Sequence, residues 1–452
     1  MRDLKDITHF YFIGIGGIGM SALARYLHTQ GKHVAGYDRI VTSLSKKLED
    51  EGIDIHYESK FDKIPSAFKN PETAQVVYTP AVPQTFDELV RFRESGIPIT
   101  KRAQLLGQIS KTMTCLAIAG THGKTTTSAI LAHLLYQSDI KTTAFLGGIL
   151  EGYNTNYLNS GTDVMVVEAD EFDRSFLQLE PNVAGVTAID PDHLDIYGNE
   201  EEFRKAFEEF GALVPEGALF INESVKLSGN TIGFDSGDYH TSHLTIVDGA
   251  YYFNLVTPSG TIKNWSLRLP GRHNLANAIL AVAMALEYGA DPEKLKKALA
   301  TFKGVERRFS YKLDTEKFVV IDDYAHHPTE INAVYQAVAE MYPDEEYTVI
   351  FQPHLYSRTK DFMDDFASSL SQFHKVGMLN IYAAREEPME GVHAAVLCDL
   401  IRNQEQSPHM TTLLEKEDIA EFVKEMGNRI VLLLGAGDIG AEVERVVKEL
   451  AR

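Results

Sequence analysis

The sequence has few of the features that mark secreted or membrane proteins. Its 452 residues include only two cysteines, Cys115 and Cys398, which excludes a disulfide framework and fits a reducing cytoplasm. Residues 1–9 are charged and lack the apolar core of a signal peptide. The longest apolar candidate for a membrane span, residues 278–286, is too short and ends at Glu287. We therefore expect a cytoplasmic protein without membrane insertion.

Positive charge is also scarce. The chain has 43 lysines and arginines against 64 aspartates and glutamates, a formal net charge of -21. Such an acidic chain is a poor match for a phosphate backbone, so we expect no nucleic-acid partner. Local loops can still be positive, so an anionic small molecule is not excluded. The length exceeds what one hydrophobic core supports, which predicts two or three domains.

Alternating strand and helix patterns begin three times along the chain. Apolar runs that predict buried strands open each block, at residues 9–13, 113–118 and 318–321. Such alternation is typical of parallel sheets covered by helices, so the predicted fold class is α/β. Between residues 217 and 269 the runs become short and alternating, which predicts a few antiparallel strands appended to the middle block.

The motif with the most chemical content opens the middle block. It reads, in order, Gly120, Thr121, His122, Gly123, Lys124, Thr125 and Thr126. It lies between the strand 113–118 and a predicted helix at 128–136, so backbone N–H groups and a helix dipole point into one space that suits phosphate. Lys124 adds a charge for the β- and γ-phosphates, and the Thr125 or Thr126 hydroxyl can bind Mg²⁺. Because Ile118 replaces the first glycine of the full P-loop pattern, the motif is a short form that still predicts a nucleoside triphosphate.

Acidic side chains and a histidine follow two further predicted strands of this block. Glu168 comes after the strand 163–167, and His193 comes after the strand 183–189. Ligands gather at the carboxyl ends of parallel strands, so we expect both side chains to approach Thr125 and to complete a magnesium site. Three neighbouring carboxylates fit a solvated loop as well as this site: Asp170, Glu171 and Asp195.

A second glycine-rich turn lies near the N-terminus, between the strand 9–13 and a predicted helix at 20–29. Its residues are Gly14, Ile15, Gly16, Gly17, Ile18, Gly19, Met20 and Ser21. Asp38, after a predicted strand 33–37, is spaced to reach a ribose hydroxyl. The glycines allow the backbone to approach any pyrophosphate, so the residues alone leave NAD, UDP or a ligand-free turn open.

Polar loops follow four predicted strands of the third block, at residues 318–321, 347–351, 378–382 and 430–434. They contain Asp322, Asp323, His326, His327, Gln352, His354 and Arg358. Four such loops in succession favour a substrate site over solvated loops. Asn274, before a predicted helix at 275–288, either caps that helix or recognises a base edge.

Together these motifs resemble the Mur ligase family, ATP-dependent enzymes that form amide bonds in bacterial peptidoglycan synthesis. The motifs, in chain order, are residues 14–21, 120–127, 168–173, 190–198, 271–277, 307–309, 322–330 and 351–358. The resemblance implies three domains: a Rossmann-like UDP-sugar domain (1–109), a central P-loop ATPase-type domain with a parallel or mixed sheet (110–303), and a Rossmann-like amino-acid domain (304–452). It favours UDP over NAD at the first glycine turn.

Finer marks resemble the branch that joins L-alanine to UDP-N-acetylmuramate, namely His122 and the 322–330 loop with Gln352 and His354. One departure is Leu355, where many relatives of that branch have arginine. The branch that recycles a preformed tripeptide is the alternative, although it usually has phenylalanine at the position of Tyr324. An NAD-dependent oxidoreductase and a P-loop switch ATPase are more distant alternatives, because neither explains the third block.

The resemblance also implies a role for each site residue. Catalysis would involve Lys124, His193, Glu168, His327 and Arg358. ATP would contact residues 120–126, with Asn274 facing the adenine and Arg307 the phosphates or ribose, and two Mg²⁺ ions would be held by Thr125, Glu168 and His193. UDP would contact Gly16, Gly17, Ile18, Gly19, Met20, Ser21 and Asp38, and alanine would contact Asp323, His327 and Arg358. We expect a monomer or homodimer in the bacterial cytoplasm.

Overall fold

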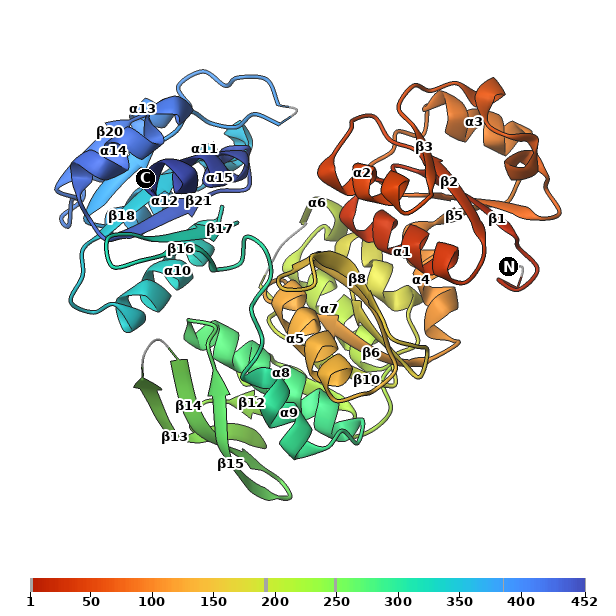
Figure 1. The fold of residues 1–452 in the computed structure, drawn as a ribbon, viewed down its shortest axis with the longest axis horizontal. Helices are drawn as coiled ribbons and strands as arrows, with labels where there is room; N and C mark the ends of the chain where they lie inside the picture. The colour runs from red at the N-terminus through yellow and green to blue at the C-terminus, as the bar shows by residue number, and fades with distance from the viewer. Residues whose placement is uncertain (1–2, 191–193, 248–249, 385, 452) are drawn as a thin grey trace. The chain divides into compact units, whose positions relative to one another are not determined.

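The computed structural model describes residues 3–190, 194–247, 250–384 and 386–451. The chain divides into two compact units, coloured along its length in Figure 1. The first unit comprises Met1–Leu244, Tyr252–Ser266 and Ala276–Phe302, and the second comprises Thr245–Tyr251, Leu267–Leu275 and Lys303–Arg452. Within the described ranges, no helix combines the length and the apolar character that crossing a membrane requires.

The first sheet is parallel, with the strand order β3-β2-β1-β4-β5. Its strands are β1 (His9–Ile13), β2 (His33–Tyr37), β3 (Asp54–His56), β4 (Ala74–Tyr78) and β5 (Ile99–Lys101). Its helices are α1 (Ile18–Thr29), α2 (Ser43–Asp50), η1 (Phe61–Lys63), η2 (Ser66–Lys69), α3 (Asp87–Glu94) and α4 (Arg102–Ser110). The strands β2 and β3 are added on one side of β1, and β4 and β5 on the other side, so the strand order switches between β1 and β4. The glycine turn after β1 therefore lies at the point where ligands of such sheets bind.

The central sheet is mixed, in the order β15-β14-β13-β12-β11-β10-β6-β9-β7-β8. Its strands are β6 (Thr114–Ala119), β7 (Thr142–Leu150), β8 (Thr155–Asn159), β9 (Val164–Glu168), β10 (Val183–Val186), β11 (Leu219–Asn222), β12 (Asn230–Gly233), β13 (Tyr239–Val247), β14 (Ala250–Thr257) and β15 (Gly260–Leu267). The helices are α5 (Lys124–Gln137), η3 (Phe172–Gln178), α6 (Leu194–Tyr197), α7 (Glu200–Gly211), α8 (Arg272–Glu287) and α9 (Pro292–Leu299). Only Pro258 and Ser259 join β14 to β15, a connection that antiparallel neighbours alone can make, as predicted for this segment.

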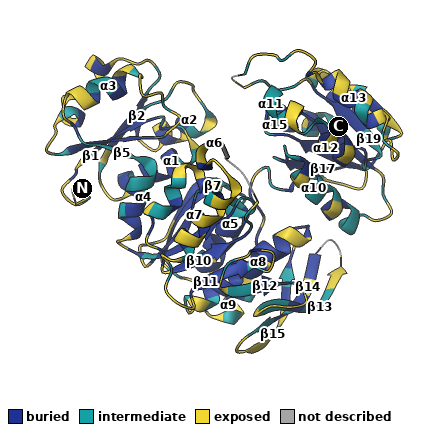
Figure 2. Cartoon of the chain, turned by 180° about the vertical axis from the view of Figure 1, so that it is seen from behind, coloured by how far each residue is buried: buried dark blue, intermediate teal, exposed yellow. Residues whose placement is uncertain are grey.

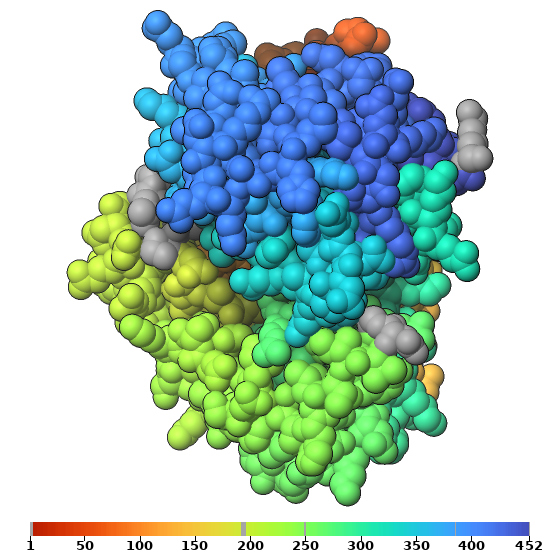
Figure 3. All heavy atoms as spheres, turned by 90° about the vertical axis from the view of Figure 1, so that its left-hand side faces the viewer, coloured from red at the N-terminus to blue at the C-terminus, as the bar shows by residue number. Residues whose placement is uncertain are grey.

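The third sheet has the order β16-β17-β21-β18-β19-β20, and only its edge strand β16 is antiparallel. Its strands are β16 (Ser310–Asp314), β17 (Val319–Asp323), β18 (Tyr347–Phe351), β19 (Lys375–Met378), β20 (Met410–Leu413) and β21 (Ile430–Leu434). The helices are α10 (Pro328–Met341), α11 (Tyr356–Asp361), α12 (Met363–Leu370), α13 (Ala394–Arg402), η4 (Lys416–Asp418), α14 (Ile419–Met426) and α15 (Ile439–Leu450). These elements gather into one continuous body, turquoise to blue in Figure 3.

The central strands of the sheets, such as β1, β6 and β21, are buried on both faces, dark blue in Figure 2, whereas exposed residues lie on loops, on the strands β13 and β15 and on the outer faces of helices such as α7. In β1 the alternation is direct: Phe10 and Phe12 enter one apolar cluster and Tyr11 and Ile13 enter another. The cluster that contains Phe10 continues without a break into the central sheet, where it includes Ala117 and other strand residues. The first two sheets therefore share one core.

Several predicted boundaries are wrong. Helix α5 begins at Lys124 rather than at residue 128, and α8 begins at Arg272 rather than at residue 275. Strand β10 ends at Val186, and β19 ends at Met378, where the predicted strand began. The sequence pattern does not reveal the first turns of these two helices, because those turns are polar and carry no apolar periodicity.

A stability prediction follows from Gly107 in α4. A Cβ at this position would lie 2.2 Å from the backbone oxygen of Gln178, which cannot move aside freely. We expect Gly107→Ala to destabilise the fold by about 1–3 kcal/mol, measured by urea unfolding. The matched control is Gly211→Ala in α7, where the nearest atom is a Leu219 methyl carbon at 3.2 Å. Equal stabilities of the two variants would contradict the prediction.

Candidate active site

The turn between β6 and α5 is shaped by two glycines. Gly120 and Gly123 have φ angles of +130° and +80°, which favour glycine. A Cβ on Gly120 would lie 2.1 Å from the Thr187 hydroxyl, and one on Gly123 would lie 2.7 Å from the Asn277 side-chain oxygen. Helix α5 begins directly after Gly123. Its first backbone N–H groups therefore face the turn and form the phosphate-binding arrangement that the sequence predicts.

Lys124 is paired within this turn. Its Nζ donates to the Gly120 carbonyl at 2.5 Å and to both carboxylate oxygens of Glu171 at 2.7 and 2.9 Å. The Glu171 side chain is only 3% exposed, so this is a buried ion pair and not a solvated loop. A bound polyphosphate would compete with Glu171 for the same ammonium group. The sequence places Glu171 near the site but carries no signal for this pairing.

Glu168 lies at the end of β9 and accepts three hydrogen bonds. Its carboxylate accepts from the Thr125 hydroxyl at 3.2 Å, the Ser128 hydroxyl at 3.2 Å and the Gly147 N–H at 2.6 Å. Burial raises the pKa of Glu168, and the Gly147 N–H and the Lys124 charge oppose that effect. The predicted metal pair, Thr125 and Glu168, is therefore brought together.

These two oxygen donors suit Mg²⁺, which takes its remaining ligands from phosphate and water. Within the described part of the chain, no group of three or more histidine, cysteine or acidic side chains is arranged to hold a metal. His193, predicted as a further ligand, lies outside the described residues.

The remaining residues of the turn have distinct environments. Thr126 is buried, so Thr125 is the hydroxyl that reaches Glu168. The Thr121 hydroxyl accepts the Asp190 N–H at 3.1 Å, and His122 Nε2 lies 3.7 Å from the Asp190 carboxylate. Asp190 therefore closes one side of the phosphate turn.

The N-terminal glycine turn is held by Asp38. The Gly16 N–H donates to Asp38 at 2.7 Å, and a Cβ on Gly16 would lie 2.9 Å from the same oxygen. Helix α1 starts after Gly17, with Ile18, Gly19 and Met20 in its first turn. The Ser21 hydroxyl is buried and donates to the Ile18 carbonyl at 2.9 Å. The predicted UDP contacts of the turn thus rest on backbone N–H groups and on Asp38, since the Ser21 side chain points inward.

A cavity of about 240 Å³ lies between the two glycine turns, within the first unit. Its lining includes Gly19, Arg102, Lys124, Phe145, Glu168 and Phe176. Arg102 reaches over Gly19, where a Cβ would lie 2.2 Å from its Nη1, and donates to Asp170 at 2.7 Å. Two cations, each paired with a carboxylate, therefore border one cavity. An anion on the N-terminal side can meet a phosphate on the P-loop side there.

In the second unit, two predicted amino-acid contacts also have local structural partners. The Asp323 carboxylate accepts the backbone N–H groups of Phe309 at 2.6 Å and Ala325 at 2.7 Å. Burial raises the pKa of Asp323 to about 6. His327 caps α10, with Nδ1 accepting the Thr329 N–H at 3.3 Å. Both residues fix the loop between β17 and α10.

Arg358 and two histidines lie together at the ends of β17 and β18. Arg358 Nη1 is 3.5 Å from Nδ1 of His354, whose ring stacks on Tyr382 at 5.7 Å and lies 6.0 Å from the His326 ring. Burial, helped by the neighbouring His326 and Arg358, lowers the pKa of His354 to about 4. A neutral histidine leaves Arg358 as the cation of this cluster, which suits a small carboxylate ligand.

The two predicted nucleotide contacts of the second unit are engaged locally. Arg307 donates to the Gly435 carbonyl, lies 3.5 Å from the Asp322 carboxylate and packs over the Tyr324 ring at 5.0 Å. Asn274 is buried and donates to the Pro270 carbonyl at 2.6 Å. A capping role for Asn274 is wrong, because α8 begins two residues before it. Contacts of both side chains with ATP stay predictions.

Comparison with known proteins identifies the family. Three family models match successive parts of the chain: "Mur ligase family, catalytic domain" at 9–114, "Mur ligase middle domain" at 118–285, and "Mur ligase, glutamate ligase domain" at 307–437. A UDP-N-acetylmuramate–L-alanine ligase of Christiangramia forsetii is 52% identical across 100% of this chain and 99% of its own. The chain belongs to the Mur ligase family.

Solved structures of Mur ligases agree with this assignment. The crystal structure of the UDP-N-acetylmuramate–alanine ligase from Thermotoga maritima has a TM-score of 0.82 and 29% identity, and covers 98% of this chain and 99% of that one. A murein peptide ligase from Psychrobacter arcticus has a TM-score of 0.66 at 22% identity, covers 98% of this chain and 99% of that one, and shows the fold alone. The predicted three-domain α/β architecture is confirmed.

Some residues around the Mur ligase site had no signal in the sequence. Ser128 and Gly147 hold Glu168, and Arg102 crosses from the first sheet. Each depends on contacts between segments far apart in the sequence. Of the candidates that the sequence names, Thr125, Glu168 and Lys124 gather at one sheet edge, whereas Arg358 and His327 belong to the second unit.

The depressed pKa of His354 predicts a pH dependence of stability. Its pKa is lowered from 6.5 to about 4, so between these values the unfolded chain binds more protons than the folded one. The free energy of unfolding therefore decreases as the pH falls from 6.5 towards 4. We expect the stability of His354→Gln, measured by urea unfolding, to fall less steeply over this window than that of the wild type. Parallel curves would refute this effect.

Proposed function

We propose that this chain is an ATP-dependent ligase that joins L-alanine to the lactyl carboxylate of UDP-N-acetylmuramate, in peptidoglycan precursor synthesis. The observation that carries the proposal is the cavity between the two glycine turns, which is bordered by Lys124, Glu168 and Arg102. It offers one place where a UDP-linked carboxylate can meet the γ-phosphate of ATP. The name of the Christiangramia forsetii relative supports the choice of alanine.

A carboxylate does not react with an amine at neutral pH unless it is activated. Here a carboxylate oxygen would bond to the γ-phosphorus of ATP while the bond to the bridging oxygen breaks and ADP leaves. The alanine amine would then attack the acyl phosphate carbon, lose a proton and release phosphate. Such chemistry needs positioning and charge neutralisation more than covalent help from the protein.

The first unit would supply most of this charge neutralisation. Lys124 would exchange Glu171 for the β- and γ-phosphates, and Thr125 and Glu168 would hold Mg²⁺, which neutralises phosphate charge when bound. Arg102 would hold the carboxylate on the opposite side of the cavity. His193 stays proposed for a second Mg²⁺ ion, and the turn from Gly16 to Ser21 with Asp38 stays proposed for UDP.

The second unit would supply the amino-acid site. Arg358 is the cation proposed for the alanine carboxylate, while Asp323 would act by holding the loop that carries His327. His327 stays the candidate for the general base. Asn274 and Arg307 stay proposed for the adenine and for the phosphates or ribose. A cytoplasmic monomer or homodimer is the proposed form.

Phosphate release with UDP-N-acetylmuramate, ATP and Mg²⁺ tests the reaction directly. We expect release with L-alanine and none with the L-Ala-D-Glu-diaminopimelate tripeptide. Release with the tripeptide alone would assign the chain to the recycling branch. ATP turnover that does not depend on the UDP-sugar would rule out a ligase.

Lys124→Ala tests the division of labour between the two turns. Loss of the phosphate-binding cation should lower kcat more than about a hundredfold, because a charge is removed where charge develops. Binding of UDP-N-acetylmuramate, measured by calorimetry, should stay at the wild-type level. The control is Lys294→Ala, which removes an exposed lysine paired with Asp139 and should leave both readouts unchanged. Lost UDP-sugar binding in Lys124→Ala would disprove the division.

A further inference from the structure

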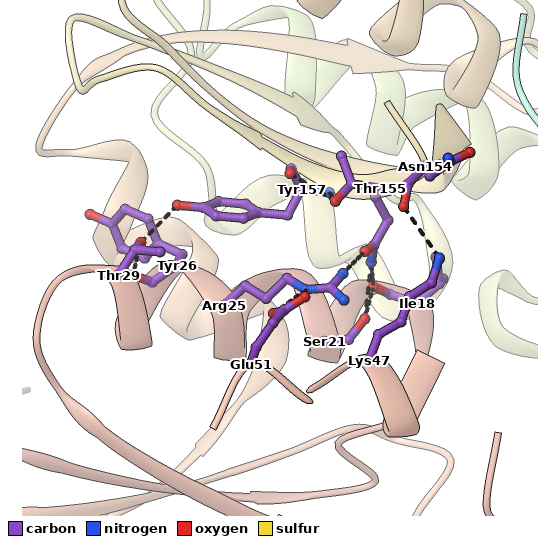
Figure 4. Close-up of polar contacts among 11 residues, drawn as sticks. Ile18, Ser21, Arg25, Tyr26, Thr29, Lys47, Glu51, Asn154, Thr155 and Tyr157 are labelled. Carbon is purple, nitrogen blue, oxygen red and sulfur yellow. Dashed lines mark hydrogen bonds and ion pairs between the residues drawn. The ribbon is translucent and has the colours of Figure 1, made fainter. Parts of the chain in front are cut away.

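A buried asparagine of the central sheet holds the first turn of α1. Asn156 lies on β8 and its side chain is 0% exposed. Its Nδ2 donates to the Ile18 carbonyl at 2.5 Å and to the Ser21 hydroxyl at 2.9 Å, and its Oδ1 accepts from Arg25 Nη1 at 2.5 Å (Figure 4). Donor and acceptor groups of the amide are thus all used on α1, and none on its own sheet.

Other polar contacts of this interface reach different parts of the N-terminal domain. Tyr157 meets Thr29 at the far end of α1 at 3.1 Å, and Lys47 donates to the Asn154 carbonyl at 3.3 Å (Figure 4). Neither of these contacts touches the turn whose N–H groups are proposed to bind the UDP pyrophosphate, whereas the contacts of Asn156 with Ile18 and Ser21 do. Its contacts with Ser21 and Arg25 are buried, where a lost hydrogen bond is most costly, and its contact with Ile18 is partly buried.

The hairpin formed by β7 and β8 also contacts Glu168, the carboxylate proposed to bind Mg²⁺. Strand β7 pairs with β8 at Phe145–Tyr157 and again at Leu150–Thr155, and the register shifts in between. In that irregular stretch the Gly147 N–H donates to Glu168 at 2.6 Å, and a Cβ on Gly147 would lie 2.4 Å from a Glu168 oxygen. One end of the hairpin therefore contacts Glu168 through β7 and the first turn of α1 through β8.

We propose that Asn156 is a positioning residue that fixes the UDP-sugar turn relative to the magnesium and ATP site. By holding Ile18 and Ser21 it would set how far the bound sugar's carboxylate lies from the γ-phosphate. Strand β7 is itself fixed to β9 by parallel pairing from Thr142 to Phe145, so loss of Asn156 would loosen the first turn of α1 and leave Glu168 in place. This inference rests on the proposed function.

The substitution Asn156→Asp removes the hydrogen bonds that the amide donates and keeps the one that it accepts from Arg25. The aspartate keeps an oxygen acceptor for Arg25 but places a second oxygen against the Ile18 carbonyl, where a donor stood. We expect KM for UDP-N-acetylmuramate to rise about tenfold or more, and kcat to fall, while KM for ATP changes less than about twofold. Calorimetric binding of the UDP-sugar without ATP should weaken by a similar factor.

The matched control is Tyr157→Phe, which removes the hydroxyl that meets Thr29 from the next residue of the same strand. It should leave KM for UDP-N-acetylmuramate within about twofold of the wild type, since the first turn of α1 is untouched. If Asn156→Asp does not fold, Ser21→Ala serves instead, because it removes one acceptor of the same amide. A smaller rise in KM for the UDP-sugar alone is then expected.

Two results would overturn the inference. One is an Asn156 variant, or Ser21→Ala in its place, with a lowered melting temperature but unchanged KM for the UDP-sugar, which would show a merely structural role. The other is an equal rise in KM for ATP and for the UDP-sugar. If wild-type protein releases no phosphate in a UDP-sugar-dependent way, the proposed function fails, and that result is distinct from both.

Discussion

The constraint on which the site depends is the continuous apolar core of the first two sheets. Phe10 of β1, Leu23 of α1, Ala117 of β6 and Phe176 of η3 belong to one buried cluster. Because such a core is packed as densely as a crystal, its elements cannot slide past one another. The two glycine turns at the carboxyl ends of β1 and β6 are therefore held at a defined separation, with a cavity between them.

Three of the buried polar groups in this part of the chain lie beside the two glycine turns or the helix that follows the first of them. Arg25, Glu171 and Asn156 are all buried, and a buried polar or charged group is costly unless it is fully paired. Each has such a partner: Glu51 and Asn156 for Arg25, and Lys124 for Glu171. The polar pairs thus mark the positions at which the two glycine turns are joined to the framework around them.

Much of the framework could be predicted from local sequence. Strands 9–13, 33–37, 347–351 and 430–434 are confirmed because each is a short apolar run bounded by glycine, proline or a charged residue. The glycine turns could be predicted because their glycines directly follow such strands. The contacts that could not be predicted join residues that are far apart along the chain. The pairs Lys124–Glu171, Arg102–Asp170 and Arg25–Asn156 join residues 47, 68 and 131 positions apart, and no local pattern encodes them.

The pairing of Lys124 with Glu171 has a consequence for the end of the catalytic cycle. A cation that already has an internal anion gives up one partner to gain another, so phosphate binding at this turn is an exchange and not a net gain of an ion pair. The same exchange runs in reverse once the γ-phosphate has been transferred. In the proposed reaction Glu171 would then compete with ADP for the ammonium group and favour product departure, which would link a tight resting site to repeated turnover.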